Sequence, residues 1–201
     1  GVTLDVPPEQ IIRSHHDFTG IPDDLFALLD ELRRQGGAEF KLALQAGCLC
    51  DNLRIRDLLK RERGNISAFC MGEYGIPSRI LAVAWGSVST YAMLEGQALA
   101  PGMLNVAEMA QRYRAGDLSP DTAVYGITGL HVGHSLSPRL HNEAVARSGI
   151  GAVYLPLAAR DAADFVQFAR SLPLKGASVT VPFKESLARH CASLDATAQA
   201  L

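Results

Sequence analysis

Patterns typical of strands and of helices alternate along the first half of the chain, and this alternation restricts the fold more than any other feature. Short apolar runs typical of strands occur at residues 10–18, 39–44, 65–71 and 88–91. Each run is followed by helical spacing of apolar residues, at residues 21–34, 53–63, 78–85 and 106–114. Such alternation predicts an α/β fold with a parallel sheet, and four βα units are half of an eightfold (β/α)8 barrel.

Polar residues lie in or after three of these strands, where a barrel carries its chemistry. His16 lies at the end of the first strand, Lys41 inside the second, and Arg79 after the third. Burying a lysine lowers the pKa of its amine, which then attacks a ketone to form an imine. A histidine could shuttle protons beside it, and an arginine could hold a substrate carboxylate.

Each of these three residues also has a simpler interpretation. The Lys41 side chain could extend to the rim of the barrel, where its ammonium meets water. His16 could cap or orient a neighbour, and Arg79 could be a solvated residue of its helix. From the residues alone, both interpretations stay open for all three.

The run GASVTVPFKE at residues 176–185 is the most informative stretch of the second half. Val179–Val181 predicts a short strand that Pro182 ends. Lys184 follows at once, so a rigid strand end would present its ammonium, with the hydroxyls of Ser178 and Thr180 nearby. The alternative is an ordinary surface lysine after a turn.

A second stretch, residues 124–138, reads as a strand, a glycine-rich turn and a pair of serines. Ser135 and Ser137 precede Pro138, and helical spacing follows over 139–147. Ser137 is therefore predicted to be the N-cap, with Pro138 at the first helical position. Further strand and helix patterns are found at 152–157, 162–172 and 184–192.

Composition limits the possible partners and compartment. The 201 residues are 48% hydrophobic with a net charge of −2, which argues against disorder and against nucleic-acid binding. No apolar run is long enough to span a membrane, and no signal peptide is visible. The four cysteines form no C-x-x-C pair and are expected to be buried free thiols in a reducing cytoplasm.

Two other residue groups have some features of ligand sites. Gly126, Gly129 and Gly133 follow a strand, but their spacing differs from G-x-G-x-x-G and argues against dinucleotide binding there. Three histidines, His131, His134 and His141, lack the supporting cysteine or carboxylate spacing of a metal site. We therefore expect no metal and no cofactor-binding residues in this chain.

Residues 10–115 resemble type I 3-dehydroquinate dehydratase. The matching stretches are S-H-H-D-F, F-K-L-A, M-G-x-x-G-I-P-S-R, G-S-V-S-T and Ala-Pro-Gly. The resemblance implies that Lys41 is the Schiff-base lysine, His16 the general acid/base and Arg79 the carboxylate anchor. Leu99 and Met103 flank Ala-Pro-Gly, where that family usually has a serine and a glutamine that contact substrate.

The stretch from residue 123 onward resembles the substrate-binding domain of shikimate dehydrogenase, through S-x-S-P and V-T-V-P-F-K in that order. The resemblance implies that Ser135 and Ser137 hold the substrate carboxylate and that Lys184 is the catalytic lysine, with Ser178 and Thr180 also binding substrate. It implies NADP as the cofactor of the dehydrogenase, held outside this chain.

Together the resemblances predict a bifunctional shikimate-pathway enzyme that converts 3-dehydroquinate to 3-dehydroshikimate and then to shikimate. The expected organisation is a partial dehydratase barrel at 1–116, a linker at 117–122 and a dehydrogenase substrate domain at 123–201. Gly1 in place of Met, and a helical pattern reaching Leu201, lead us to expect a segment of a longer protein. The expected compartment is the cytoplasm, or a plastid in a plant-like source. Alternatives are a non-catalytic barrel scaffold on an active dehydrogenase, and a module that only binds a small acid.

Overall fold

The computed structural model describes residues 6–94, 96 and 102–200. It contains two parallel three-stranded sheets, each built from strand–helix units. The strands are β1 (Ile12–Asp17), β2 (Glu39–Gln45), β3 (Ile66–Met71), β4 (Ala123–Gly129), β5 (Ala152–Ala158) and β6 (Gly176–Val179). The helices are η1 (Pro8–Gln10), α1 (Leu25–Arg34), α2 (Asp51–Arg61), η2 (Glu73–Gly75), α3 (Ile76–Trp85), η3 (Glu108–Arg112), α4 (Ser137–Ser148), α5 (Ala162–Ser171), α6 (Lys184–Ala188) and α7 (Ala196–Ala200).

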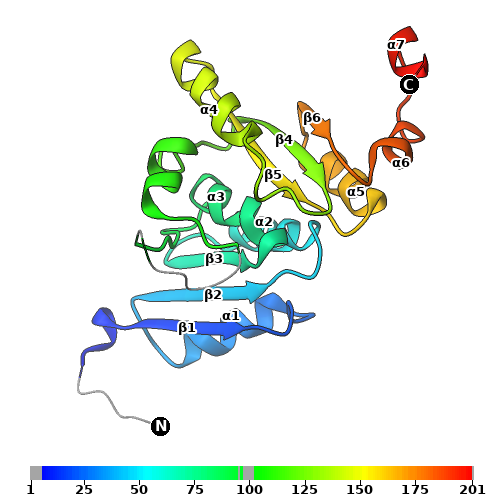
Figure 1. The fold of residues 1–201 in the computed structure, drawn as a ribbon. Helices are drawn as coiled ribbons and strands as arrows, with labels where there is room; N and C mark the ends of the chain where they lie inside the picture. The colour runs from blue at the N-terminus through cyan, green and yellow to red at the C-terminus, as the bar shows by residue number, and fades with distance from the viewer. Residues whose placement is uncertain (1–5, 95, 97–101, 201) are drawn as a thin grey trace.

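The strand orders are β1-β2-β3 in the first sheet and β5-β4-β6 in the second. Helices α2 and α3 lie between the sheets (Figure 1). Residues of both sheets and of these helices belong to one continuous hydrophobic core, which includes Leu44, Ile80 and Leu155. The two halves of the chain therefore bury apolar surface against each other, and the α/β fold with parallel sheets expected from the sequence is confirmed.

The alternation of side chains along β2 explains how the first sheet is oriented. Phe40, Leu42 and Leu44 are buried in the core that the helices cover. Lys41 lies on the opposite face, because successive side chains of a strand point to opposite sides. In a closed barrel, this opposite face would line the interior.

The strand predicted at residues 88–91 does not form. Val88 N donates to Ile66 O at 2.8 Å, but Ser89 N donates to the side-chain oxygen of Ser67 at 3.1 Å. The hydroxyl takes the place of a backbone partner, so no regular ladder is established. Within the described residues, the first sheet has three strands, and the predicted fourth βα unit lacks its strand.

The predicted helix at 106–114 begins at Val106 and takes the π form over Glu108–Arg112. The predicted helix at 184–192 is also shorter, because α6 ends at Ala188. His190 N donates to Leu187 O at 2.9 Å, an i→i+3 bond that tightens the chain after the helix. Apolar spacing does not distinguish such endings from a continued α-helix.

Two boundaries near the second site also differ from the prediction. Strand β6 covers Gly176–Val179 rather than the predicted Val179–Val181, because its pairing with β4 ends at the Thr128–Val179 pair. Ser137 is the first residue of α4 and Leu136 is its N-cap. The Ser137 N–H donates to the Ser135 hydroxyl at 3.2 Å, so Ser135 rather than Ser137 supplies the side-chain acceptor.

The expectation of buried thiols is correct for Cys70 only. Cys48 and Cys50 are half-buried, and Cys191 is exposed because the chain leaves the core after α6. Burial raises the pKa of both Cys50 and Cys70 to about 12. These two thiols therefore stay protonated near neutral pH.

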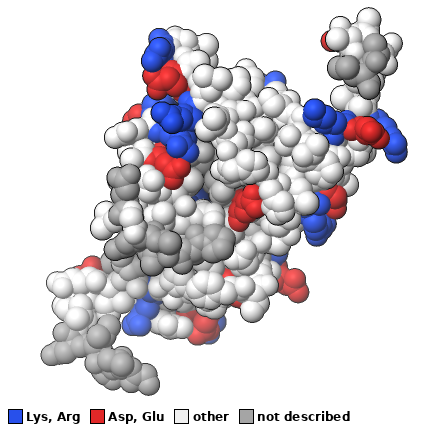
Figure 2. Space-filling model, in the orientation of Figure 1, with Lys and Arg blue, Asp and Glu red and all other residues white. Residues whose placement is uncertain are grey.

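Charged side chains of both signs lie close together on the face drawn in Figure 2. Helix α4 carries one such pair, in which Arg147 and Glu143 lie 2.9 Å apart. In the described part of the chain, every helix falls short of the length and apolar character required to cross a bilayer.

Candidate functional site

The first site is built on the face of the β1-β2-β3 sheet that carries Lys41. In the parallel register, Ser14 pairs with Lys41 and His16 with Ala43. Lys41 and His16 therefore lie on the same face of neighbouring strands, with His16 nearer the carboxyl end. The structure brings these two predicted residues to one surface.

Lys41 is half-buried against two aromatic rings. Its Nζ lies 3.5 Å from the centre of the Tyr91 ring and 5.9 Å from that of Phe69. Burial, and then the positive charge of Arg79, lower the pKa of the Lys41 amine, while Glu39 acts in the opposite direction. A lowered pKa increases the fraction of neutral, nucleophilic amine at a given pH.

Arg79 reaches the same aromatic group from α3. Its guanidinium carbon lies 4.5 Å from the Phe69 ring centre, and Nη1 donates to Tyr91 O at 2.9 Å. The residue is only 3% exposed, so the alternative of a solvated helix residue is wrong. Burial lowers its pKa to about 10, and its buried Nε has no hydrogen-bond partner among the described residues. A guanidinium is a planar group of donors that pairs well with a carboxylate.

His16 lies on the exposed edge strand β1 and stacks on Phe18, with the ring centres 6.4 Å apart. Partial burial lowers its pKa, and the positive charges of Lys41 and His15 add to that effect. The imidazole is therefore mostly neutral near pH 7, which is the form that accepts a proton.

The second site lies at the carboxyl ends of β4 and β6. Thr180 N donates to Thr128 O at 2.9 Å, so the segment after β6 runs beside the end of β4. Gly129 packs so closely on Thr180 and Val181 that an added Cβ would collide with them. The turn with Ser135 follows Gly129, which brings the serine turn and the V-T-V-P-F-K segment to one edge of the sheet.

Ser178 has a partner that sequence reasoning missed. The hydroxyl of Tyr154, on β5, donates to Ser178 Oγ at 2.8 Å. The Tyr154 ring stacks on His141 with the ring centres 4.2 Å apart. Because Tyr154 supplies the donor, the Ser178 hydroxyl keeps its own hydrogen for another acceptor. In the sequence Tyr154 is simply one apolar residue of a buried strand.

Lys184 is exposed at the first residue of α6, after the buried Phe183. No hydrogen bond or ion pair of its amine is found within the described residues. The structure therefore places Lys184 on the segment that continues from Thr180, without joining it to the serine pair by a direct contact.

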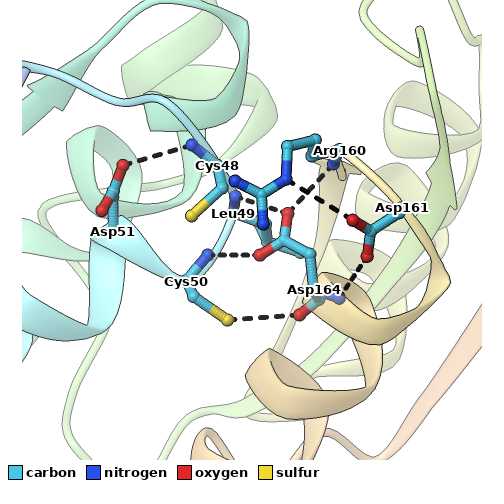
Figure 3. Close-up of polar contacts among 7 residues, drawn as sticks. All are labelled: Cys48, Leu49, Cys50, Asp51, Arg160, Asp161 and Asp164. Atoms are coloured by element: carbon cyan, nitrogen blue, oxygen red, sulfur yellow. Dashed lines mark hydrogen bonds and ion pairs between the residues drawn. The ribbon is translucent and has the colours of Figure 1, made fainter.

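A buried carboxylate links the two halves of the chain close to these edges. Figure 3 shows Asp164, near the start of α5, facing the loop that leads from β2 into α2. Asp164 accepts hydrogen bonds from Leu49 N at 2.8 Å and Cys50 N at 2.9 Å, and also from Arg160 N at 3.0 Å. In the sequence, Asp164 looks like a first-turn carboxylate of its own helix, and no local signal indicates its long-range partners.

The glycine-rich loop after β4 does not fit a dinucleotide. Its amides at Val132 and Gly133 donate to the carboxylate of Glu73, at 3.2 and 3.3 Å. A pyrophosphate group needs such amides free, and here an anion of the protein already accepts from them. In the described residues, no group of three histidines, cysteines or carboxylates is arranged to hold a metal ion.

Comparison with known families gives one match in each half of the chain. Residues 7–119 match the family of type I 3-dehydroquinase. Residues 127–201 match the shikimate dehydrogenase substrate binding domain. The chain belongs to the type I 3-dehydroquinase family. Its second part is similar to the shikimate dehydrogenase substrate binding domain, so the resemblance noted in the sequence is confirmed.

Two of three individual relatives match nearly the whole chain, and the third matches one part of it. The chain is 30% identical over 195 residues to the chloroplastic bifunctional 3-dehydroquinate dehydratase/shikimate dehydrogenase of Arabidopsis thaliana, covering 96% of this chain and 32% of that protein. It is 29% identical over 196 residues to the shikimate biosynthesis protein AroDE of Chlamydia pneumoniae, covering 96% and 40%. It is 43% identical over 82 residues to the shikimate dehydrogenase (NADP(+)) of Anaeromyxobacter dehalogenans, covering 40% and 30%. The chain thus spans 32% to 40% of the length of the two relatives that match nearly all of it.

Proposed function

We propose that this chain is part of a bifunctional enzyme that dehydrates 3-dehydroquinate and reduces the resulting 3-dehydroshikimate to shikimate. Residues 1–116 would carry dehydratase residues on a partial barrel, residues 117–122 would link the two parts, and residues 123–201 would bind the substrate of the dehydrogenase. One observation carries the proposal. Lys41 and Arg79 flank the same Phe69 ring, and the His16 strand pairs with the Lys41 strand.

The proposed dehydration begins at the neutral amine of Lys41. Its nitrogen attacks the substrate ketone, and loss of water gives an iminium. The iminium acidifies the adjacent C–H, so the imidazole of His16 removes that proton and returns one to the departing hydroxyl. The Arg79 guanidinium, which lies on the same Phe69 ring as Lys41, holds the substrate carboxylate. Hydrolysis of the imine then releases 3-dehydroshikimate and restores Lys41.

Two positions of this half differ from the type I dehydratase pattern that the sequence resembles. Met103 is half-buried where relatives usually have a polar contact. Leu99, at the corresponding position before Ala-Pro-Gly, lies outside the described residues. Either the dehydratase works without these two polar contacts, or the barrel is a non-catalytic scaffold for the dehydrogenase. The convergence of Lys41 and Arg79 favours a working dehydratase.

For the second reaction, this chain would bind the substrate and supply a proton. Ser135 and Ser137 would hold the carboxylate, and Ser178 and Thr180 would donate to ring hydroxyls. Lys184 would protonate the ketone oxygen as the carbonyl is reduced. NADPH is the proposed hydride donor, and because the glycine-rich loop does not fit it, other residues of the enzyme must hold it. We propose a cytoplasmic enzyme, or a plastid one in a plant-like source.

Borohydride trapping tests the dehydratase assignment. The full-length enzyme is incubated with 3-dehydroquinate and borohydride, and its peptides are analysed by mass spectrometry. We expect an adduct on the peptide that contains Lys41, and none there in Lys41→Arg. Lys60→Arg, which removes an exposed lysine of α2, serves as the control and should keep the adduct. An active enzyme without an adduct at Lys41 would contradict the mechanism, and an inactive one would favour the scaffold.

Steady-state kinetics test the dehydrogenase assignment. Lys184→Ala should lower kcat by roughly 10²-fold, the usual worth of a positioned acid or base, with a smaller change in KM. Ser135→Ala should act mainly on KM, because it removes binding that the ground state and the transition state share. Dehydratase turnover is the internal control and should be unchanged in both variants. If Lys184→Ala left kcat intact while Ser135→Ala abolished turnover, the roles of acid and anchor would be wrong.

A further inference from the structure

Glu73 extends from the first half of the chain into the second. It is the first residue of η2, directly after β3 and Gly72, and its side chain is about one-third exposed. One carboxylate oxygen accepts from Val132 N at 3.2 Å and from Gly133 N at 3.3 Å. The other lies 3.1 Å from Nδ1 of His131. A single carboxylate therefore holds three consecutive residues of the loop that follows β4.

That loop leads directly into the serine turn. Ser135 N donates to Val132 O at 3.0 Å, and Ser137 N donates to Ser135 Oγ at 3.2 Å. The position of the Ser135 hydroxyl thus depends on Val132, and Val132 is held by Glu73. A ligand-binding group is held most precisely when its supporting residues are themselves hydrogen-bonded.

The next residue braces the same edge by packing. Tyr74 packs against a small buried cluster of Ile127, Val132, Tyr154 and Ala158. Tyr154 is the residue whose hydroxyl donates to Ser178. The Glu73–Tyr74 segment therefore contacts the supports of both the serine turn and Ser178, and it does so from the dehydratase half of the chain.

We propose that Glu73 is a positioning residue for the carboxylate-binding turn of the dehydrogenase site, so that the dehydratase half sets the affinity of the dehydrogenase for its substrate. This inference rests on the proposed function of Ser135 and Ser137. Without Glu73, the loop would have to be ordered each time substrate binds, and the cost of that ordering weakens binding. Lys184 lies on another segment, so the chemical step keeps its proton donor.

The test uses dehydrogenase kinetics of the full-length enzyme with Glu73→Ala and Glu73→Gln. We expect Glu73→Ala to raise KM for 3-dehydroshikimate about tenfold, the scale of one lost charge-assisted hydrogen bond, with kcat changed less than about twofold. Glu73→Gln keeps an oxygen that can accept from the Val132 and Gly133 amides. Its KM should therefore lie between those of Glu73→Ala and the wild type. The control is Glu143→Ala, an exposed carboxylate of α4 that pairs with Arg147, and its KM should match the wild type.

Hydrogen exchange gives a readout that does not depend on activity. In the ligand-free enzyme, Glu73→Ala should speed amide exchange of the peptide containing Val132 and Gly133, and Glu143→Ala should not. Unchanged exchange, or an unchanged KM in an active enzyme, would overturn the inference and leave the proposed function standing. A folded wild-type enzyme without dehydrogenase activity would overturn the proposed function, and with it the role given to Glu73. If Glu73→Ala does not fold, the same two measurements on Glu73→Gln decide.

Discussion

Asp164→Ala should lower the free energy of unfolding by about 3–5 kcal/mol, because the side chain joins the two halves of the chain through buried hydrogen bonds. The Asp164 residue is 5% exposed and accepts from Leu49 N, Cys50 N and Arg160 N at 2.8, 2.9 and 3.0 Å. A buried donor left without a partner costs about 1–3 kcal/mol. Leu49 is fully buried, so loss of its hydrogen bond should cost about 2 kcal/mol of stability. The amides of Cys50 and Arg160 can bind water instead, so loss of each of their hydrogen bonds should cost about 1 kcal/mol.

Asp161→Ala is the matched control, three residues earlier on the same chain segment. Asp161 is exposed and caps its own helix by accepting from Asp164 N at 2.9 Å. Loss of such a cap costs about 1 kcal/mol. Both substitutions remove one carboxylate from the start of α5, but only the Asp164 side chain contacts the first half of the chain. The difference between them measures the contact across the junction.

Urea unfolding followed by the fluorescence of Trp85 is a suitable assay. Trp85 is the only tryptophan of the chain, and it is 8% exposed at the end of α3, in the shared core. With a urea m value of about 2 kcal/mol/M, Asp164→Ala should unfold at a urea concentration about 1–2 M lower than Asp161→Ala. Equal midpoints for the two variants would refute the reasoning that the junction depends on this buried carboxylate.

Three further predictions follow from the same structure. The lowered pKa of Lys41 means that its neutral amine is populated at lower pH than that of an ordinary lysine. In competitive methylation across a pH series, the reactivity of Lys41 should therefore reach its midpoint at a lower pH than that of an ordinary lysine. A midpoint at the ordinary pH would contradict the burial argument. Brief alkylation at pH 8 should modify the exposed Cys191 first, and Cys50 and Cys70 should react at least about tenfold more slowly. Peptide mass spectrometry measures the three rates, and equal rates would contradict the prediction. Residues 1–115 alone should aggregate or dimerise, because β1 is an open sheet edge and part of the shared core would be missing. A monomer by sedimentation that melts cooperatively would contradict this prediction.

The local pattern of the chain was sufficient to predict most of its elements. The period of apolar residues located β2, β3, β5 and α5 nearly to the residue, because side-chain periodicity follows directly from strand and helix geometry. The order of strands and helices predicted parallel sheets. The motifs around Lys41, Arg79 and Ser135 also identified the family, since each motif is a short continuous stretch.

Other features depend on residues that only the fold brings together. The strand predicted at 88–91 is lost because the hydroxyls of serines, including Ser67 from β3, replace its backbone partners. Asp164 and the Leu49 amide are 115 residues apart, and Glu73 and the Val132 amide are 59 apart. A carboxylate early in a helix or after a strand has the same local pattern whether it meets water or a distant amide. The sequence by itself therefore determined most of the elements and the family. The tertiary structure decided which segments support one another, because hydrogen bonds at long sequence separation leave no periodic signal.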